Sequence, residues 1–381
     1  MFRKMPFVLI AIILVILLIN PLLSLSAKQF IYAISLTIKS LIILILPFVI
    51  FGLLFKAVVS LSTKASKIIG LILILVCFSS LVSLSISYFI GSWVYHFDLE
   101  IITPRTANDL SPLWYFNIPS IIANDKAMFA GIILGMLVGK FFPQKANFFS
   151  DKLEQIIAKI LNIIFYIIPI FVAGFVIKLQ YDGVMTAIIK DYSFIFIIIG
   201  LAQLSYLLLA YFLLNNGSYR EFISNIRNML PAAISGFSTM SSAASMPLTI
   251  IAAQNNAKNK NIVRSVIPAT VNIHLVGDCF ATPILAFAIL KSYGIVEPSL
   301  YGYFIFSLYF ILAKFSVAAI PGGGILVMLS ILENNLGFNA PMMSLITALY
   351  IIFDPVITCA NVLGNGAFAK MVDKIVERFK I

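Results

Sequence analysis

Charge is the scarcest feature of this 381-residue sequence: only 11% of its residues are Asp, Glu, Lys or Arg, whereas 61% are hydrophobic. Soluble domains are about one-quarter charged, so this balance excludes an ordinary water-soluble fold. The mean hydropathy of +1.06 points the same way. Because lipid offers the backbone no hydrogen bonds, helices must satisfy them internally. We therefore expect an all-α polytopic membrane protein.

Cysteine and histidine are also nearly missing. Cys77, Cys279 and Cys359 lie in apolar segments without a CxxC pair or a histidine-rich set, which predicts neither disulfides nor a transition-metal site. No GK[ST] follows the glycines at 322–324, so they are no phosphate loop. The net charge of +11 is dispersed over short loops, which favours membrane topology over a nucleic-acid partner. We expect no cofactor and no nucleic acid.

Long apolar runs are what the sequence has in abundance. They predict eight transmembrane helices, near 7–25, 30–61, 67–94, 127–142, 156–177, 192–214, 262–290 and 342–369. Two further apolar stretches, 229–253 and 299–336, are broken near the middle by small residues and a proline. The breaks read STMSSAASMP at 238–247 and AAIPGGGI at 318–325. Such interruptions predict two re-entrant helical hairpins.

The basic residues test this topology. With a cytoplasmic N-terminus and two hairpins, 18 of the 26 Lys and Arg residues fall on the inner side, as the positive-inside rule requires. If either hairpin were a full span, the basic loop at 258–264 or the basic C-terminus would lie outside. We therefore place both termini in the cytoplasm and the chain in the inner (plasma) membrane, as a multi-pass protein.

A coarse repeat accompanies the hairpins. A hairpin followed by a helix with polar residues occurs at 229–290 and again at 299–369, and the two units enter from opposite sides. Inverted repeats with interrupted segments indicate a transporter whose binding site lies near the membrane midplane.

Ionisable residues inside the predicted spans are the first site candidates. His274 and Asp278 are the only ones between Arg264 and Lys291, and their spacing predicts one helical face. A charge at this depth costs about 2.5 kcal/mol or more, so such residues usually serve a pathway. A structural pair that fastens the helix to a neighbour is the alternative.

The last span carries a longer polar stripe. In FDPVITCANVLGN, Asp354, Thr358, Asn361 and Asn365 are spaced i, i+4, i+7 and i+11, which predicts one face. A carboxylate there suits an ammonium group or a cation, whereas the alternative is polar contact between helices. The serines of the third span, at 79–87, are interpreted as small residues that permit close helix packing.

These motifs resemble the dicarboxylate/amino-acid:cation symporter family, the glutamate and aspartate transporter homologues, over nearly the whole chain. The resemblance is carried by SSAASMP, IPGGGI and FDPVITCANVLGN, with lesser matches in NIPSIIANDKAMFAGIILGMLVG and YIIPIFVAGF. It implies a homotrimer whose transport core moves against a scaffold like an elevator. We expect mainly scaffold and trimerisation helices with part of the core in 1–155, the fifth and sixth helices in 156–228, and the transport core in 229–381.

The resemblance also implies the site. Substrate contacts are expected from Ser241, Ser242, Ile320, Gly324, Asp354, Thr358 and Asn361. In the family pattern, Asp354 matches the carboxylate that holds the substrate ammonium. The stretch from Ile320 to Gly324 matches the extracellular gate. Asn361 matches a residue that also serves a sodium site through its backbone.

The sequence departs from the family pattern at several site positions, among them His274, which replaces an asparagine. Ile357 stands where an arginine binds the distal carboxylate of acidic substrates, so that carboxylate would be left desolvated. HLVGD at 274–278 replaces the signature NMDGT, so Val276 stands at a sodium-binding carboxylate and Asp278 at a threonine beside the substrate. Asn365 replaces a second sodium-binding carboxylate. These changes disfavour acidic substrates and weaken at least two sodium sites.

The leading hypothesis is a secondary active elevator transporter, not an enzyme, for a small and net-neutral amino acid. Asp354 would bind the ammonium, and the hairpin serines the carboxylate. Coupling to a cation, with H⁺ placed ahead of Na⁺, is assigned to His274, Asp278, Asn361 and Asn365.

Other functions stay open. The first alternative is sodium-driven uptake of acidic amino acids or dicarboxylates, and Asp278 beside Ile357 would also suit a cationic side chain. Remoter alternatives are a gated pore and an intramembrane hydrolase built from Ser241 or Ser242 with His274 and Asp278, for which no nucleophile motif is visible.

Overall fold

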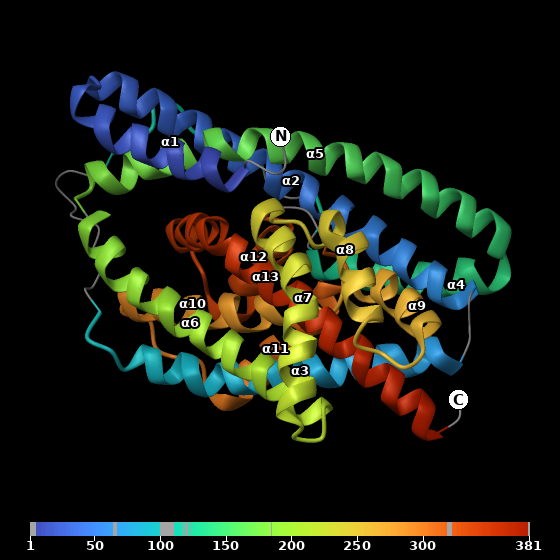
Figure 1. Ribbon diagram of the computed structural model, residues 1–381. Helices are drawn as coiled ribbons and strands as arrows, with labels where there is room; N and C mark the ends of the chain where they lie inside the picture. The colour runs from blue at the N-terminus through green and yellow to red at the C-terminus, as the bar shows by residue number, and fades with distance from the viewer. Residues whose placement is uncertain are drawn as a thin grey trace.

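The computed structural model describes residues 5–63, 67–99, 110–116, 118, 121–122, 124–183, 185–317 and 322–379. Within these ranges every regular element is a helix (Figure 1), which confirms the predicted all-α class. The elements are α1 Met5–Ile19, η2 Asn20–Leu22, α2 Leu25–Thr63, α3 Lys67–Tyr95, α4 Asn124–Phe141, α5 Pro143–Tyr181, α6 Met185–Leu214, α7 Tyr219–Thr239, α8 Ser242–Gln254, α9 Lys260–Thr270, α10 Val276–Ser292, α11 Leu300–Lys314, α12 Gly323–Leu336 and α13 Ala340–Phe379.

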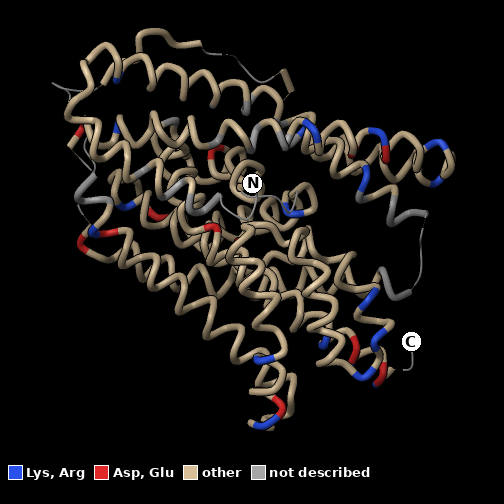
Figure 2. The backbone as a smooth tube through the Cα atoms, turned by 45° about the horizontal axis from the view of Figure 1, so that its top comes forward, with Lys and Arg blue, Asp and Glu red and all other residues tan. Residues whose placement is uncertain are grey.

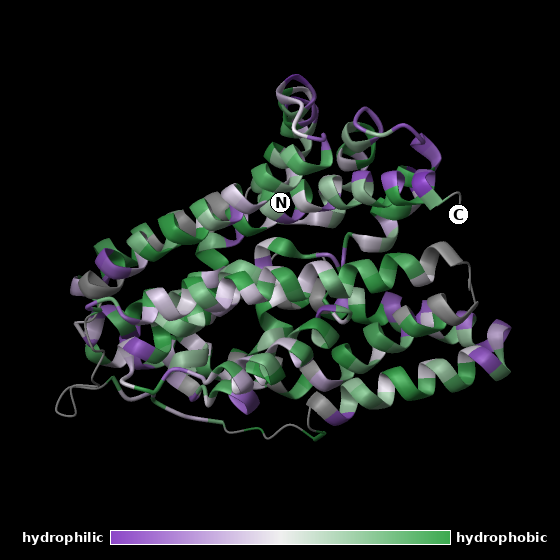
Figure 3. Cartoon of the chain, turned by 90° about the horizontal axis from the view of Figure 1, so that it is seen from below, coloured by the Kyte–Doolittle hydropathy of each residue, from purple (hydrophilic) through white to green (hydrophobic). Residues whose placement is uncertain are grey.

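The helices have the surface of a membrane protein. Among the described residues, three helical segments are long and apolar enough to cross a bilayer: Gly70–Tyr95, Ile189–Leu214 and Pro341–Phe379. Large apolar side chains such as Ile74 and Phe89 face outward, and hydrophobic colouring covers most helix surfaces in Figure 3. Charged residues lie mostly at helix ends and in loops (Figure 2). The count of eight spans and the orientation of the termini stay predictions.

The helices pack in two groups. In the first, α2 lies against α4 and α5, and α5 also against α1; these helices form the upper layer of Figure 1. A Cβ at Gly174 of α5 would lie 2.0 Å from the Ser35 Oγ of α2, so this pair needs a glycine for its close contact. In the second group, α13 packs against α6, α7, α8, α9 and α10, and α3 lies along α10. The division into scaffold and transport core stays a prediction.

Both interrupted stretches fold as paired helices. The α7 and α8 helices pack against each other and are joined by two residues, of which Met240 adopts the left-handed conformation with φ 51°. The α11 and α12 helices pack together in the same way. The first pair begins at Tyr219, ten residues before the predicted start, because Ser218 caps α7 by accepting a hydrogen bond from the Glu221 amide. The expected gate residue Ile320 lies outside the described residues.

The prediction of one continuous helix over 262–290 is wrong. The chain forms α9 and α10 with a break at residues 271–275. Side-chain amides satisfy the backbone near this break: Gly277 N–H donates to Asn361 Oδ1 at 2.8 Å, and Asn365 Nδ2 donates to the His274 carbonyl at 3.3 Å. Such partners make a non-helical segment tolerable inside a membrane protein. His274 lies in the break, so it does not share a helical face with Asp278.

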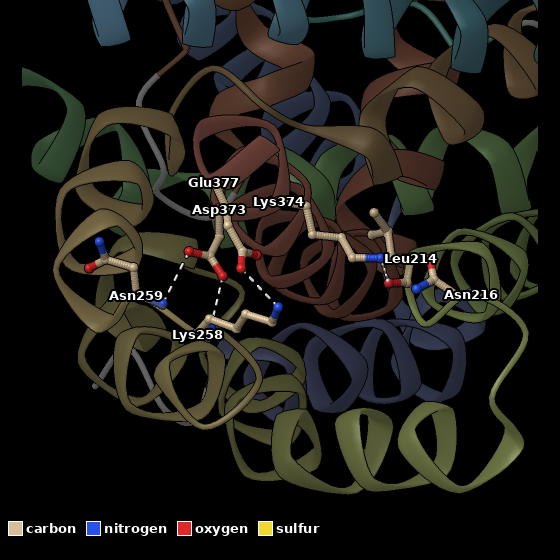
Figure 4. Close-up of polar contacts among 7 residues, drawn as sticks. All are labelled: Leu214, Asn216, Lys258, Asn259, Asp373, Lys374 and Glu377. Atoms are coloured by element: carbon tan, nitrogen blue, oxygen red, sulfur yellow. Dashed lines mark hydrogen bonds and ion pairs between the residues drawn. The ribbon is translucent and has the colours of Figure 1, made fainter. Parts of the chain in front are cut away.

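The end of α13 fastens two loops (Figure 4). The Asp373 carboxylate accepts hydrogen bonds from the backbone N–H of Lys258 at 2.8 Å and of Asn259 at 3.1 Å. Lys374 Nζ donates to the Leu214 carbonyl at 2.6 Å. The polar end of α13 therefore fixes the chain entering α9 and the chain leaving α6.

Candidate functional site

Asp278, in the first turn of α10, is held by two donors from α13. Tyr350 Oη donates to Oδ1 at 2.5 Å, and Asn361 Nδ2 donates to Oδ2 at 2.7 Å. The carboxylate is buried. Because the other end of the Asn361 amide accepts from Gly277 N–H, this one side chain joins the start of α10 to α13.

Asp354, on α13, contacts the tip of the second hairpin. Its Oδ2 accepts a hydrogen bond from Gly322 N–H at 2.8 Å, and its Oδ1 accepts from Thr358 Oγ1 at 3.0 Å. Gly322 precedes α12 and has φ 68°, a conformation that favours glycine. A carboxylate at a helix N-terminus is stabilised by the helix dipole. Gly322 thus presents its backbone N–H to the Asp354 carboxylate.

The start of α12 also reaches the other carboxylate. A Cβ on Gly324 would lie 2.1 Å from Asp278 Oδ1 and 2.3 Å from Tyr350 Oη. Only a residue without a side chain fits against this pair. Asp278 and Asp354 therefore both approach the N-terminal end of α12, from α10 and from α13.

Ile357, three residues after Asp354 on α13, is fully buried. A Cβ on Gly277 would lie 2.3 Å from the Ile357 carbonyl oxygen, so α10 and α13 are in close backbone contact at this level. The sequence contains no arginine between Arg264 and Arg378. The site consequently has acidic and amide groups but no guanidinium from these helices.

His274 and Asn365 form a separate polar position. The His274 Nε2 lies 3.0 Å from Ser79 Oγ on α3, and its ring packs on Phe368 with 4.3 Å between centroids. Asn365 Nδ2 donates to the Asn361 carbonyl at 3.0 Å. In the part of the chain that the structure describes, His274 Nδ1 and Asn365 Oδ1 have no hydrogen-bond partner. A small pocket lined in part by Ser79, His274 and Val276 opens here.

The serines of the first hairpin stabilise its tip. Ser241 Oγ accepts from the Ala244 N–H at 3.2 Å and caps α8. Thr239 and Ser245 hydroxyls lie 3.2 Å apart, and Ser245 donates to Ser235 Oγ at 3.1 Å. Ser242 is buried at the first position of α8.

The first hairpin also contacts the helix that carries the site. A Cβ on Gly236 would lie 3.2 Å from the Thr358 carbonyl oxygen, so α7 packs on α13 one turn from Asp354.

Sequence reasoning missed three polar contacts in and around the candidate site. Tyr350 stands four residues before Asp354 on the same stripe of α13, and extending that stripe would have found it. Ser79 and Ser80 do more than permit packing, because Ser79 contacts His274 and Ser80 accepts from Lys314 Nζ at 3.0 Å. The sequence signal for Lys314 is its position as a single basic residue in an apolar segment.

Comparison with known proteins identifies the family. The model of the sodium:dicarboxylate symporter family matches residues 5–375. The chain belongs to this family. The motif resemblance is thereby confirmed, and membership of a symporter family overturns the hydrolase alternative.

Three similar proteins are excitatory amino acid transporters. Excitatory amino acid transporter 1 of Homo sapiens is 26% identical over 256 residues, which cover 65% of this chain and 46% of that protein. Excitatory amino acid transporter 4 of Mus musculus is 25% identical over 256 residues, which cover 65% and 45%. An excitatory amino acid transporter of Onchocerca volvulus is 30% identical over 148 residues, which cover 39% and 30%. The matched parts are less than half of each relative's length.

Proposed function

We propose that this symporter-family chain carries a small, net-neutral amino acid across the inner (plasma) membrane together with a cation. In this proposal the chain works as an elevator-type homotrimer, in which the α7–α13 region moves against the group formed by α1, α2, α4 and α5. The Asp354 carboxylate binds the substrate ammonium. Ser241, Ser242 and the helix ends at the two hairpin tips bind the substrate carboxylate.

The position of Asp354 carries the proposal. Its two partners are a backbone N–H and a hydroxyl, both neutral, so an arriving ammonium meets a carboxylate whose charge is not already paired. Hydrogen bonds between ionised partners are about twice as strong as neutral ones. The substrate would displace Gly322 from Asp354 and so couple its own binding to the second hairpin tip.

Buried Ile357 supports a neutral solute. A second carboxylate on the substrate would enter a site that already holds Asp278 and Asp354, and the sequence has no arginine between Arg264 and Arg378 to pair with it. Burying an unpaired charge beside two like charges is strongly unfavourable. An amino acid with a short uncharged side chain avoids that cost.

Charge balance supports one coupled cation. With Asp278, Asp354 and Lys314 ionised, the buried side chains of the core carry one net negative charge. A zwitterionic amino acid leaves that charge unchanged, so one H⁺ or Na⁺ restores neutrality. We favour H⁺ because His274 and Val276 offer no anionic oxygen to Na⁺, whereas sodium prefers hard oxygen ligands. His274 and Asp278 then act at separate positions rather than as one pair.

Uptake into proteoliposomes under separate gradients tests the proposal. Alanine and serine should accumulate under an inward proton gradient without sodium, and glutamate and aspartate should not compete with them. Uptake of an acidic amino acid that requires sodium and ignores the pH gradient would overturn it.

The second candidate is sodium-driven transport of acidic amino acids or dicarboxylates. The description of the family and the names of the relatives favour it. It requires a cationic group near Ile357, and the same uptake experiment decides between the two. Countertransport of labelled substrate distinguishes either carrier from a gated pore, because a pore shows no trans-stimulation.

A further inference from the structure

Lys314 is an unusual residue for the interior of this protein. It is the last residue of α11, and it is 1% exposed. Its Nζ donates to Ser80 Oγ on α3 at 3.0 Å and to Cys279 Sγ on α10 at 3.1 Å. The ammonium therefore lies between α3, α10 and α11.

Within the described residues, this ammonium has no carboxylate in direct contact. Among the ion pairs of the described residues, none within 4.0 Å involves Lys314. Buried charges in membrane proteins usually pair with an opposite charge, because an unpaired one is strongly disfavoured. Its direct partners are instead a hydroxyl and a thiol, and the thiol is a weak acceptor. A simple structural tether has no need of a full charge at this place.

The groups around the Lys314 ammonium nevertheless favour a positive charge. Lys314 lies at the C-terminal end of α11, where the helix dipole gives a partial negative charge that attracts cations. Asp278, the neighbour of Cys279 on α10, interacts with Lys314 electrostatically. The Asp278 carboxylate itself bonds to Tyr350 and Asn361 of α13, whereas Cys279 faces Lys314. The Lys314 ammonium thus contacts Cys279, the residue after Asp278, rather than the Asp278 carboxylate itself.

We propose that Lys314 is a tethered cation, which holds the position of a monovalent ion between α3, α10 and α11. Because the Lys314 ammonium is part of the chain, such a symporter needs one fewer cation from solution to neutralise the buried carboxylates of its core. The inference depends on membership of the symporter family and on the Lys314 contacts, and it holds for a neutral or an acidic substrate.

Truncation of the side chain tests the proposal without any substrate. Lys314→Ala removes the charge and opens space beside Ser80 Oγ, whereas Lys314→Met removes the charge but fills the space. The probes are methylammonium, which has the chemistry of the missing head group, and Na⁺, with N-methylglucamine as a large control cation. The measurement is the Tm of the purified full chain.

A cation that binds only the folded state raises its Tm. We expect methylammonium to raise the Tm of Lys314→Ala by several degrees more than that of the wild type or of Lys314→Met. Na⁺ should act in the same direction, and N-methylglucamine should not. An equal response of all three proteins to methylammonium overturns the proposal.

Two further outcomes are decisive. If Lys314→Ala is recovered folded only when purified in methylammonium, the proposal is supported. If it fails in both buffers while Lys314→Met is recovered, the side chain acts through its volume, and the proposal is overturned. The proposal is also overturned if Lys314→Met abolishes stabilisation by glutamate but keeps stabilisation by alanine, because Lys314 would then bind a substrate carboxylate.

Discussion

The two hairpins turn the chain back inside the protein with different chemistry. At the first tip, the hydroxyls of Thr239, Ser241 and Ser245 bond to groups of the same hairpin. At the second tip, Gly322 has no side chain, and its N–H donates to Asp354 of α13. The hydrogen bonds described at the first tip thus lie within the hairpin, whereas the one described at the second tip joins it to another helix.

Because of this difference, we expect the two hairpin tips to respond differently to a ligand. A ligand bound to Asp354 competes with the Gly322 N–H and so changes the contact that fixes the second tip. A ligand near the first tip meets a turn whose backbone is already capped. We therefore expect the second hairpin to respond to substrate and the first to provide a constant surface.

The largest expected effect comes from Asp354→Asn, which removes the charge but keeps an acceptor for Gly322 N–H. Loss of a hydrogen bond to a charged group corresponds to about 1.5–3 kcal/mol, so amino-acid uptake should fall about 10- to 100-fold. Stabilisation by ligand in thermal unfolding should vanish while the unliganded Tm stays near the wild type. Glu333→Gln, at an exposed position near the end of α12, is the control and should leave uptake unchanged. Retained ligand stabilisation in Asp354→Asn would contradict the ammonium assignment.

Gly324→Ala should follow, because its methyl group would overlap Asp278 Oδ1 and Tyr350 Oη at 2.1 and 2.3 Å. Overpacking costs about 1–3 kcal/mol, so the Tm should fall by several degrees and uptake should fall with it. Gly200→Ala, where a Cβ meets no atom within 4 Å, is the matched control and should leave the Tm unchanged or raise it. An unchanged Tm for Gly324→Ala would mean that α12 does not approach Asp278 so closely.

Ser241→Ala tests the self-stabilised tip. Loss of an N-cap costs about 0.5–2 kcal/mol, and the Tm of the unliganded protein should fall accordingly. Ser265→Ala removes an exposed hydroxyl that bonds to a carbonyl within its own helix, and should have less effect. If Ser241→Ala lowers uptake without lowering the Tm, the serine serves the substrate rather than the turn.

The smallest effect is expected just beyond the first hairpin, at the exposed ion pair between Lys258 Nζ and Glu377. The Glu377 carboxylate raises the pKa of Lys258 above its ordinary 10.5. The pair thus stabilises the folded chain below pH 10.5, and this contribution is lost as the pH rises through the higher folded-state pKa. Glu377→Gln should lower the Tm slightly at pH 8, and the difference from the wild type should disappear in strong alkali and in high salt. A difference that persists there would require another role for Glu377.

Much of the fold was predictable because local patterns decide it. Apolar runs predicted helices, and STMSSAASMP and IPGGGI predicted the two interruptions. The polar stripe of α13 predicted Asp354, Thr358 and Asn361 as neighbours, and the structure places Asp354 and Thr358 in direct contact. The break before α10 was missed, because its partners Asn361 and Asn365 lie 84 and 91 residues away in the sequence.

By itself, the sequence determined the membrane environment, the helical class, the two interruptions, the carboxylates Asp278 and Asp354, and the absence of arginine between Arg264 and Arg378. These follow from hydropathy and from residue type, which act locally. Only the tertiary structure decided which polar groups meet: Asp278 with Tyr350, His274 with Ser79, and Lys314 with Ser80 and Cys279. Hydrogen bonds require atoms about 3 Å apart, and the packing of α3, α10, α11 and α13 alone brings these atoms together.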